Sequence, residues 1–477
     1  MDNKKARLME QQQIASNKIP RKTILARIDR LPPSRHLVGL VARIASGGWF
    51  EFYELYMPGF ISLGLVKANI YTMRPGSILD PHLFASFLAS FFFGMFVSAI
   101  GFSFVSDRLG RRAIFVKSMV VYSIAQLSIA FLSTPAAIDV ARFIAGLAVG
   151  MQLINNDSYI TELTPRATRG RYMTAAYVFI LSAIPVSAFL AAVLVPRAPF
   201  GIDGWRIVVA IGASSGLIVL LIQRGLPESP RWLETKGRFA EADAVVSNIE
   251  AHVIAEHGGK PLPPPSLDVP DAPAAAGRWT EMFSPFYLPR TIVISLFQFC
   301  QTIAVFGFTS FVPVLLVKQG FTIIHSLYYA AMIVLLAPVG GACGSYFSER
   351  IERKWQLVGS ALLIGASGTV FANAHSVPVV MISGGLIALG NNWLIAIFHP
   401  YAAELFPTRI RARAVGFTFS WSRISSICVG YWVASLLANF GTHGVFAMIA
   451  AAMLALVIAV GCFGPRTNGQ SLEILSP

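Results

Sequence analysis

Charged residues are scarce in this chain of 477 residues. Only 13% of them are Asp, Glu, Lys or Arg, against about 25% in soluble globular proteins, and 55% are hydrophobic. The composition excludes an ordinary soluble domain. Repeated apolar runs, each close to the ~20 residues that a helix needs to cross a bilayer, indicate a membrane protein with many spans.

Cysteine and enzyme motifs are also lacking. The four cysteines, Cys300, Cys343, Cys428 and Cys462, lie singly in apolar segments, so neither a disulfide nor a metal site is expected. No phosphate-binding loop is present, and no nucleophile has a base at a suitable spacing. We therefore do not expect an enzyme.

Acidic residues are fewer than basic ones, 24 against 38, which gives a net charge of +14. In a soluble protein this excess would suggest nucleic-acid binding. Here the Lys and Arg residues gather in alternate loops, the positive-inside pattern of membrane proteins. The expected partner is the lipid bilayer and not nucleic acid. The chain should lie in the plasma (cell inner) membrane as a multi-pass protein with both termini cytoplasmic, and nothing at the N-terminus resembles a cleaved signal peptide.

Twelve apolar runs predict twelve transmembrane helices, at 42–66, 83–105, 113–132, 136–163, 172–195, 205–222, 292–316, 327–347, 357–373, 377–398, 415–437 and 445–463. They fall into two groups of six. The expected division of the chain is a cytoplasmic N-terminal segment, a six-helix bundle, a cytoplasmic linker, a second bundle and a cytoplasmic tail, at 1–36, 37–223, 224–289, 290–464 and 465–477.

Two amphipathic stretches lie outside these spans. We expect 24–31 to lie on the membrane surface and 239–257 to form a helix within the linker. The Pro- and Ala-rich stretch 258–276 has the composition of an unstructured linker.

Two loop motifs recur at one offset. Asp107-Arg108-Leu109-Gly110-Arg111-Arg112 corresponds to Glu349-Arg350-Ile351-Glu352-Arg353-Lys354, and the segment from Glu162 to Arg171 corresponds to the segment from Glu404 to Arg413. Both offsets are 242 residues (349 − 107 and 404 − 162). A duplicated six-helix unit in parallel orientation explains them.

These motifs resemble those of the major facilitator superfamily over essentially the whole chain. Asp107 to Arg112 match its loop signature, although Ser103 stands where the first Gly is usual. Three further segments resemble the sugar-porter group: Arg142-Phe143-x-x-Gly146, Pro227-Glu228-Ser229-Pro230-Arg231-Trp232 and the segment from Pro465 to Glu473, in which Arg466 replaces the usual Glu. Phe50-Glu51-Phe52-Tyr53-Glu54 and the segment from Phe306 to Gly320 are more similar to the metabolite:proton symporter branch, which includes aromatic-acid, niacin and synaptic-vesicle-glycoprotein-like members.

The resemblance implies an all-α membrane protein whose twelve transmembrane helices form two pseudo-symmetric six-helix bundles. It also implies alternating access by a monomer, with charged residues that latch the cytoplasmic side. The gating candidates are Asp107, Arg108, Arg112, Glu162, Arg169, Arg171, Glu228, Glu349, Arg350, Arg353, Glu404 and Arg411. The alternative is that these are topology determinants and solvated salt bridges, each worth about 0–1 kcal/mol.

Two acids lie in the first span, where each costs roughly 2.5–3.5 kcal/mol on insertion scales. Glu51 and Glu54 are three residues apart, so they share a helix face. By the resemblance, Glu54 pairs with Arg142 and carries the coupling proton; a static ion pair is the alternative. Glu51 is a second proton site, a substrate contact or a structural residue. Asp157 either faces the cavity or solvates the inner end of its helix, and the second interpretation is slightly favoured.

The second half has one interior arginine, Arg423, about two turns into its helix. A buried guanidinium needs an anion, and a substrate carboxylate would serve. The other candidate substrate contacts are Asn391, Asn392, Gln298, Gln301, Tyr177, Tyr53 and His399. Each could instead make a hydrogen bond between helices.

We therefore expect a proton-coupled symporter that takes up a small organic anion, such as an aromatic or heterocyclic carboxylate. The proton is the coupling ion, and no other cofactor is expected. One alternative is a proton-coupled sugar or polyol transporter, but Phe299 and Ala304 stand where sugar porters have Gln and Asn. A second alternative is a transport-inactive binding or sensing protein.

Overall fold

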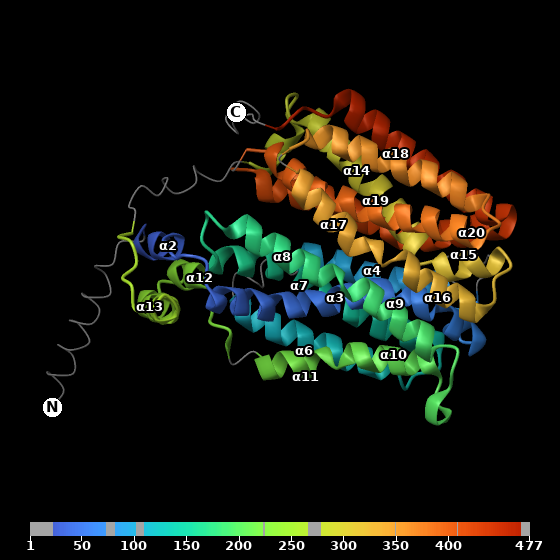
Figure 1. Ribbon diagram of the computed structural model, residues 1–477, viewed down its shortest axis with the longest axis horizontal. Helices are drawn as coiled ribbons and strands as arrows, with labels where there is room; N and C mark the ends of the chain where they lie inside the picture. Colours follow the sequence, from blue (N-terminus) through green and yellow to red (C-terminus); the bar gives the residue numbers. More distant parts are fainter. Residues whose placement is uncertain are drawn as a thin grey trace.

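The structure is a computed structural model that describes residues 22–72, 82–101, 109–222, 225–265, 278–348, 350–407 and 409–468. Two bundles of roughly parallel helices lie side by side (Figure 1). The first contains α3 (Arg35–Lys67), α4 (Phe84–Gly101), α6 (Arg111–Ile129), α7 (Pro135–Leu163), α8 (Arg169–Leu181), α9 (Ala183–Leu194), α10 (Gly204–Ala213) and α11 (Ser215–Ile222). The second contains α14 (Leu288–Thr309), α15 (Val312–Lys318), α16 (Ile323–Ile333), α17 (Leu336–Phe347), α18 (Arg353–Ala372), α19 (Val377–Glu404) and α20 (Arg411–Ile458).

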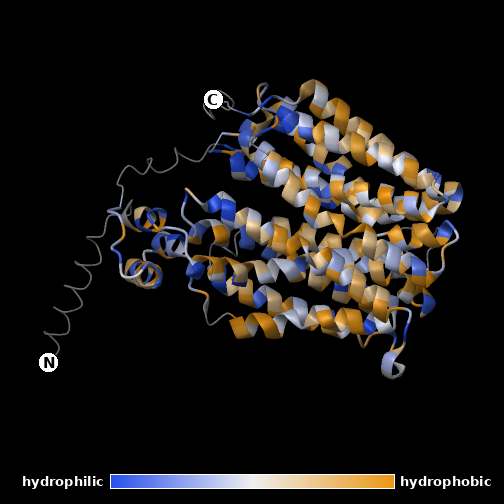
Figure 2. Ribbon diagram, viewed as in Figure 1, coloured by the Kyte–Doolittle hydropathy of each residue, from blue (hydrophilic) through white to orange (hydrophobic). Residues whose placement is uncertain are grey.

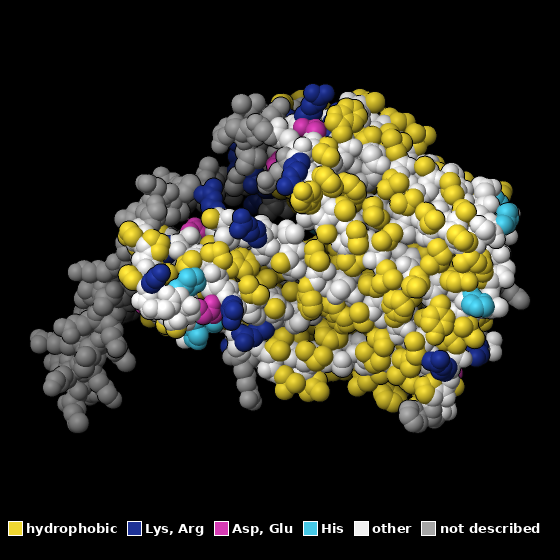
Figure 3. Space-filling model, in the orientation of Figure 1, with side chains coloured by type: hydrophobic (Ala, Val, Ile, Leu, Met, Phe, Trp, Pro, Cys, Tyr) yellow, Lys and Arg dark blue, Asp and Glu magenta, His cyan; other side chains and the backbone are white. Residues whose placement is uncertain are grey.

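The described chain crosses the bundles twelve times. Eight helical segments are long and apolar enough to span a membrane, and one of them, Arg413–Phe463, is divided in two at Gly441, which has a φ of 64° that favours glycine. The shorter apolar segments Phe84–Ala99 and Gly204–Val219 and helix α3 supply the other three spans. Hydrophobic residues dominate the middle of the helices and cover the sides of the molecule (Figures 2 and 3). The expected all-α membrane fold is confirmed.

Proline explains three breaks that divide single spans into two helices. α8 ends at Leu181, four residues before Pro185, and α14 ends at Thr309, four residues before Pro313. α16 ends at Ile333, just before Val334, which lies four residues before Pro338. A proline ring clashes with the carbonyl four residues earlier and offers no N–H, so the helix is interrupted there.

Three short helices lie at one end of the bundles, called the linker end below: α2 (Lys22–Asp29), α12 (Pro230–Thr235) and α13 (Phe239–Glu256) (Figure 1). α13 confirms the amphipathic helix expected in the linker. Ile24 and Ile28 of α2 are buried against Trp232 of α12 and against Ala242 and Val246 of α13. Protein therefore covers the apolar face of α2, and the expectation that this segment lies on the membrane surface is wrong.

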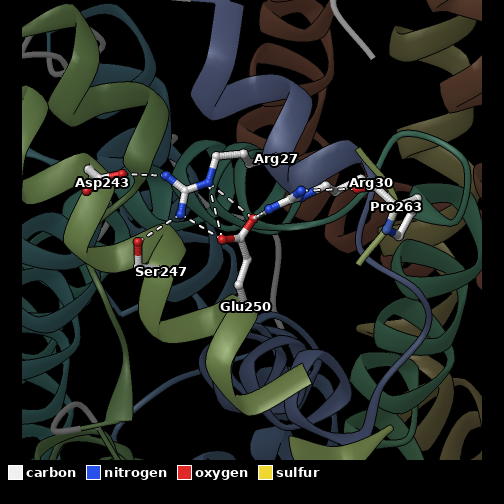
Figure 4. A network of polar contacts seen from close by, with 6 residues as sticks. All are labelled: Arg27, Arg30, Asp243, Ser247, Glu250 and Pro263. Atoms are coloured by element: carbon white, nitrogen blue, oxygen red, sulfur yellow. Dashed lines mark hydrogen bonds and ion pairs between the residues drawn. The ribbon is translucent and has the colours of Figure 1, made fainter. Parts of the chain in front are cut away.

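Ion pairs hold α2 on α13 (Figure 4). Arg27 pairs with Asp243 and Glu250 and donates to the Ser247 hydroxyl at 2.8 Å. Arg30 pairs with Glu250 at 2.6 Å. Burial raises the pKa of Glu250, but the hydrogen bonds from Arg27 and Arg30 outweigh this effect and lower the pKa overall. Glu250 therefore stays ionised at neutral pH, and this contribution to stability is lost only as the pH falls below its ordinary value of about 4.3.

Close glycine contacts bring α4 and α7 together beside the candidate site. A Cβ atom added to Gly146 would lie 2.1 Å from the carbonyl oxygen of Phe91, and one added to Gly94 would lie 2.2 Å from that of Phe143. Backbone faces backbone at both positions, so no flexible side chain could move aside. These two glycines set the distance between the helices that carry Phe91 and Arg142.

We predict that Gly146→Val separates α4 from α7 and destabilises the protein by about 1–3 kcal/mol, the usual cost of overpacking. The matched control is Gly359→Val in α18, where an added Cβ meets nothing within 4 Å. The measurement is the thermal melting of both variants purified in detergent. Equal melting temperatures for the two variants would contradict the packing described for α4 and α7.

Candidate functional site

A buried ion pair lies at the centre of the first bundle. Glu54 of α3 and Arg142 of α7 are 0% and 1% exposed, and Arg142 Nη1 pairs with Glu54 Oε1. The structure thus brings together the two residues that the sequence paired. Removing two charges from water costs several kcal/mol per ion, which only close pairing and further hydrogen bonds offset.

Aromatic residues hold both partners in place. The Arg142 guanidinium lies between the rings of Phe87 and Phe91, 4.4 and 4.3 Å from their centroids, and its Nε donates to the Phe87 carbonyl at 3.4 Å. The Tyr122 hydroxyl of α6 donates to Glu54 Oε2 at 3.0 Å. Four helices of the first bundle, α3, α4, α6 and α7, therefore converge on the pair.

Glu51 has a different environment, one turn from Glu54 toward the linker end. Its side chain is 2% exposed, and its Oε1 accepts a hydrogen bond from Asn156 Nδ2 at 2.8 Å. Gln152 Nε2 in turn donates to Asn156 Oδ1 at 3.1 Å. The sequence analysis did not find this partner. The four-residue spacing of Gln152 and Asn156 puts both amides on one face of α7 and was the available signal.

Asp157 and His399 lie on different bundles, and both are exposed although they belong to membrane-spanning helices. They interact electrostatically with each other, and Asp157 also interacts with Glu51. The His399 ring lies 6.2 Å from that of Tyr177 in α8. The surface is hollowed between the bundles at the linker end (Figure 3). Because Asp157 is exposed and interacts with a residue of the other bundle, it faces the second bundle, which favours the first of the two interpretations given above.

Arg423 is half-buried in α20, about 18 Å from the start of that helix at 1.5 Å per residue. Within the described part of the chain, no hydrogen bond or ion pair engages its guanidinium. It lies one turn beyond Phe419, whose ring is 5.6 Å from that of His399. Arg423 therefore lies one helical turn from the residue of α20 that contacts His399.

Four buried amides of the second bundle have polar atoms without a hydrogen-bond partner among the described residues. These atoms are Gln298 Nε2, Gln301 Oε1, both amide atoms of Asn391, and Asn392 Oδ1. Unsatisfied buried polar atoms are costly and call for a ligand or water.

Tyr53, another candidate substrate contact, differs from these amides because its hydroxyl already has a hydrogen-bond partner. It is completely buried and donates to the Val208 carbonyl at 2.9 Å, so it does not reach the cavity.

Matching ion pairs lie at the linker end of each bundle. Arg111 pairs with Glu162 at 3.2 Å, and Arg353 pairs with Glu404 at 2.9 Å. The second pair stands 242 residues after the first at both positions (353 − 111 and 404 − 162). The structure therefore places Arg111, which the sequence analysis omitted from its gating candidates, and not Arg112 in this ion pair. The repeat offset from Arg353 would have identified it.

Glu228 caps α6. Its Oε1 accepts hydrogen bonds from the backbone N–H groups of Arg111 and Arg112, where a negative charge favours the helix N-terminus. Gly110 has a φ of 98°, and a Cβ there would lie 2.5 Å from Glu228 Oε2. Glycine therefore allows the carboxylate to approach.

The other gating candidates make local contacts or fall outside the described residues. Arg169 and Arg411 donate to the Thr164 and Phe406 carbonyls, and Arg350 stacks on Tyr346. No described acid pairs with Arg112 or Arg171. Asp107, Arg108 and Glu349 lie outside the described residues. The described residues include no group of three or more His, Cys, Asp or Glu side chains that could hold a metal, and all four cysteines are free.

Comparisons with known proteins agree with this architecture. The putative metabolite transport protein YyaJ of Bacillus subtilis is 30% identical over 447 residues, which cover 94% of this chain and 96% of that protein. The niacin transporter NiaP of Acinetobacter baylyi is 27% identical over 452 residues, covering 94% and 99%. The xylose transporter XylE from E. coli, in a partially occluded inward-open conformation, has the same fold, with a TM-score of 0.72 at 16% identity over 92% of this chain and 100% of that one.

A family model described as "Sugar (and other) transporter" matches residues 42–477, far more than half of the chain. The protein therefore belongs to this family: it is a membrane transporter of the major facilitator superfamily and not an enzyme.

Proposed function

We propose that this transporter takes up a small organic anion together with a proton. The observation that carries the proposal is the difference between Arg142 and Arg423, two arginines within membrane-spanning helices. Arg142 has an acid, Glu54, whereas Arg423 has no acid within the described chain. A guanidinium held away from water requires an anion, and a carboxylate that arrives with the substrate supplies one in bidentate geometry.

Glu54 and Arg142 couple the proton to this step. A proton that binds Glu54 removes its charge and releases Arg142, and its departure re-forms the ion pair. The two bundles rock about the central cavity so that it opens to one side at a time. Charged residues at the linker end, among them the pairs Arg111–Glu162 and Arg353–Glu404 within each bundle, help to close that side when the opposite side opens. The proton is the only cofactor required, and one copy of the chain suffices.

We place the linker end in the cytoplasm. Lys and Arg residues concentrate in the loops of that end, as the positive-inside rule requires. Both termini are then cytoplasmic. The bacterial relatives favour the plasma membrane.

The second candidate is a proton-coupled sugar or polyol transporter. The unpartnered amides of Gln298, Gln301, Asn391 and Asn392 favour it because hydroxyl groups would satisfy them. The two candidates make opposite demands on Arg423, since a neutral sugar does not neutralise a guanidinium. Among the relatives, NiaP is named for a heterocyclic carboxylate, which favours the organic anion.

Competition between carboxylates and sugars for uptake distinguishes an organic-anion transporter from a sugar transporter. Purified protein in proteoliposomes is given an inward proton gradient and a panel of labelled solutes: benzoate, nicotinate, glucose and xylose. The organic-anion proposal expects a carboxylate to accumulate and glucose and xylose to leave its uptake unchanged. Accumulation of a sugar that excess carboxylate does not inhibit would favour the second candidate.

We predict that Glu54→Gln abolishes accumulation driven by the proton gradient while leaving exchange of labelled for unlabelled substrate intact. Gln fills the same volume but mimics the protonated acid permanently. The control is Glu241→Gln, which alters an exposed acid on α13. If Glu54→Gln still concentrates the carboxylate against its gradient, Glu54 does not carry the coupling proton.

We predict that Arg423→Gln weakens carboxylate binding about 10- to 100-fold, as expected from the loss of a charge-assisted hydrogen bond of about 1.5–3 kcal/mol. Arg197→Gln is the control, because among the described residues this exposed arginine donates only to the Val193 carbonyl. Binding is measured by isothermal calorimetry or by thermal shift with the same carboxylate. Unchanged affinity in Arg423→Gln would remove the assignment of the anion site.

A further inference from the structure

The ion pair of Glu54 and Arg142 has no direct contact with solvent. Both side chains are buried almost completely, and the rings of Phe87 and Phe91 cover the guanidinium. A proton that loads or leaves Glu54 must therefore pass through other groups. The proposed function does not say which groups these are.

Glu51 lies between Glu54 and the cavity. The two acids are three residues apart on α3, so their Cβ atoms are about 5–6 Å apart, within reach of a side-chain rotation or one bridging water. Glu51 is 2% exposed and has no positively charged partner in the described chain. Its Oε1 accepts from Asn156, and no described residue donates to its other oxygen. A buried carboxylate without a countercharge is costly, so this free oxygen is suited to receive a proton.

Asn156 holds Glu51 in this position. Its amide is oriented by Gln152, which accepts a hydrogen bond from the Ser118 hydroxyl of α6. Hydrogen bonds thus connect α6, α7 and α3. They hold the Glu51 carboxyl group against α7. The next residue of α7, Asp157, is exposed in the cavity and interacts electrostatically with Glu51. Helix α7 therefore contributes both Asn156, which positions Glu51, and Asp157, which is exposed to water.

We propose that Glu51 and Asp157 form the route by which protons move between Glu54 and the cavity at the linker end. This inference rests on the proposed function, in which Glu54 carries the coupling proton. The O–H bond of Glu54 breaks as one forms on Glu51. The proton then passes to Asp157 and to water in the cavity, and Glu54 pairs again with Arg142. No oxidant, metal or other reactant takes part.

The titratable neighbours of this route are few. Arg142 and Tyr122 face Glu54, and Tyr122 also interacts with Glu51. Asp157 faces Glu51, Tyr177 of α8 and His399 of the second bundle. Because His399 belongs to the other bundle, movement of the bundles changes the field at Asp157. Proton release is thereby sensitive to whether the linker end is open.

The test measures proton exchange without a substrate. Infrared difference spectroscopy after a pH jump follows the carboxyl C=O band that Glu54→Gln abolishes. In Glu51→Gln and Asp157→Asn, protonation of Glu54 is expected to be at least about tenfold slower than in the unmodified protein. The control is Asp203→Asn, at an exposed acid near the start of α10, which leaves the rate unchanged.

The outcomes separate this inference from the proposed function. Wild-type protonation rates in both Glu51→Gln and Asp157→Asn would overturn the route while leaving Glu54 as the proton carrier. Absence of any band that depends on Glu54 would overturn the proposed function itself. Asp157 lies on the cavity surface, so Asp157→Asn carries the test if Glu51→Gln does not fold. If Asp157→Asn exchanges labelled for unlabelled substrate at a rate within about twofold of wild type, its slow protonation of Glu54 reflects a proton route and not a structural defect. Loss of substrate exchange in this variant would contradict the route.

Discussion

The fully buried ion pair between Glu54 and Arg142 constrains the rest of this transporter. Two charges can stay in a membrane-spanning bundle only if they face each other and every remaining polar atom near them is engaged. The structure meets this demand with two aromatic rings, a backbone carbonyl and a tyrosine hydroxyl from neighbouring helices. The tight glycine packing of α4 against α7 keeps these groups in place. A single proton is enough to unbalance the arrangement, which suits the pair to couple proton binding to movement.

The two bundles share a framework but have different chemistry. The repeat preserves the linker-end pairs Arg111–Glu162 and Arg353–Glu404, which lie at equivalent positions. The acids of the central region, in contrast, belong to the first bundle. The unengaged guanidinium belongs to the second, together with the unpartnered amides that are candidate substrate contacts: Gln298, Gln301, Asn391 and Asn392. In the proposed mechanism, proton handling therefore lies on one side of the cavity and substrate recognition on the other. His399 of the second bundle and Asp157 of the first interact electrostatically, so movement of one bundle would change the field at the charged group of the other.

Most of the fold could be predicted because hydrophobic length and a 242-residue repeat determine where spans lie and how they are duplicated. The pairing of Glu54 with Arg142 could be predicted from the resemblance to the sugar-porter group, and the structure brings the two residues together. The proline breaks could have been located by counting four residues back from Pro185 and Pro313. The packing of α2 against α12 and α13 could not be predicted, because an amphipathic pattern does not tell whether lipid or protein covers the apolar face. The contact of Glu51 with Asn156 depends on how α7 is rotated against α3, which sequence spacing alone leaves open.

Coupling of the proton to the organic anion is the central claim, and proton movement driven by substrate tests it most directly. Proteoliposomes containing the unmodified protein and an internal pH dye, with no imposed proton gradient, receive labelled nicotinate or benzoate on the outside. The account predicts that uptake of the anion acidifies the interior in proportion to the amount taken up, and that protein-free liposomes show no such response. Uptake of the label without any protein-dependent change in internal pH would contradict it.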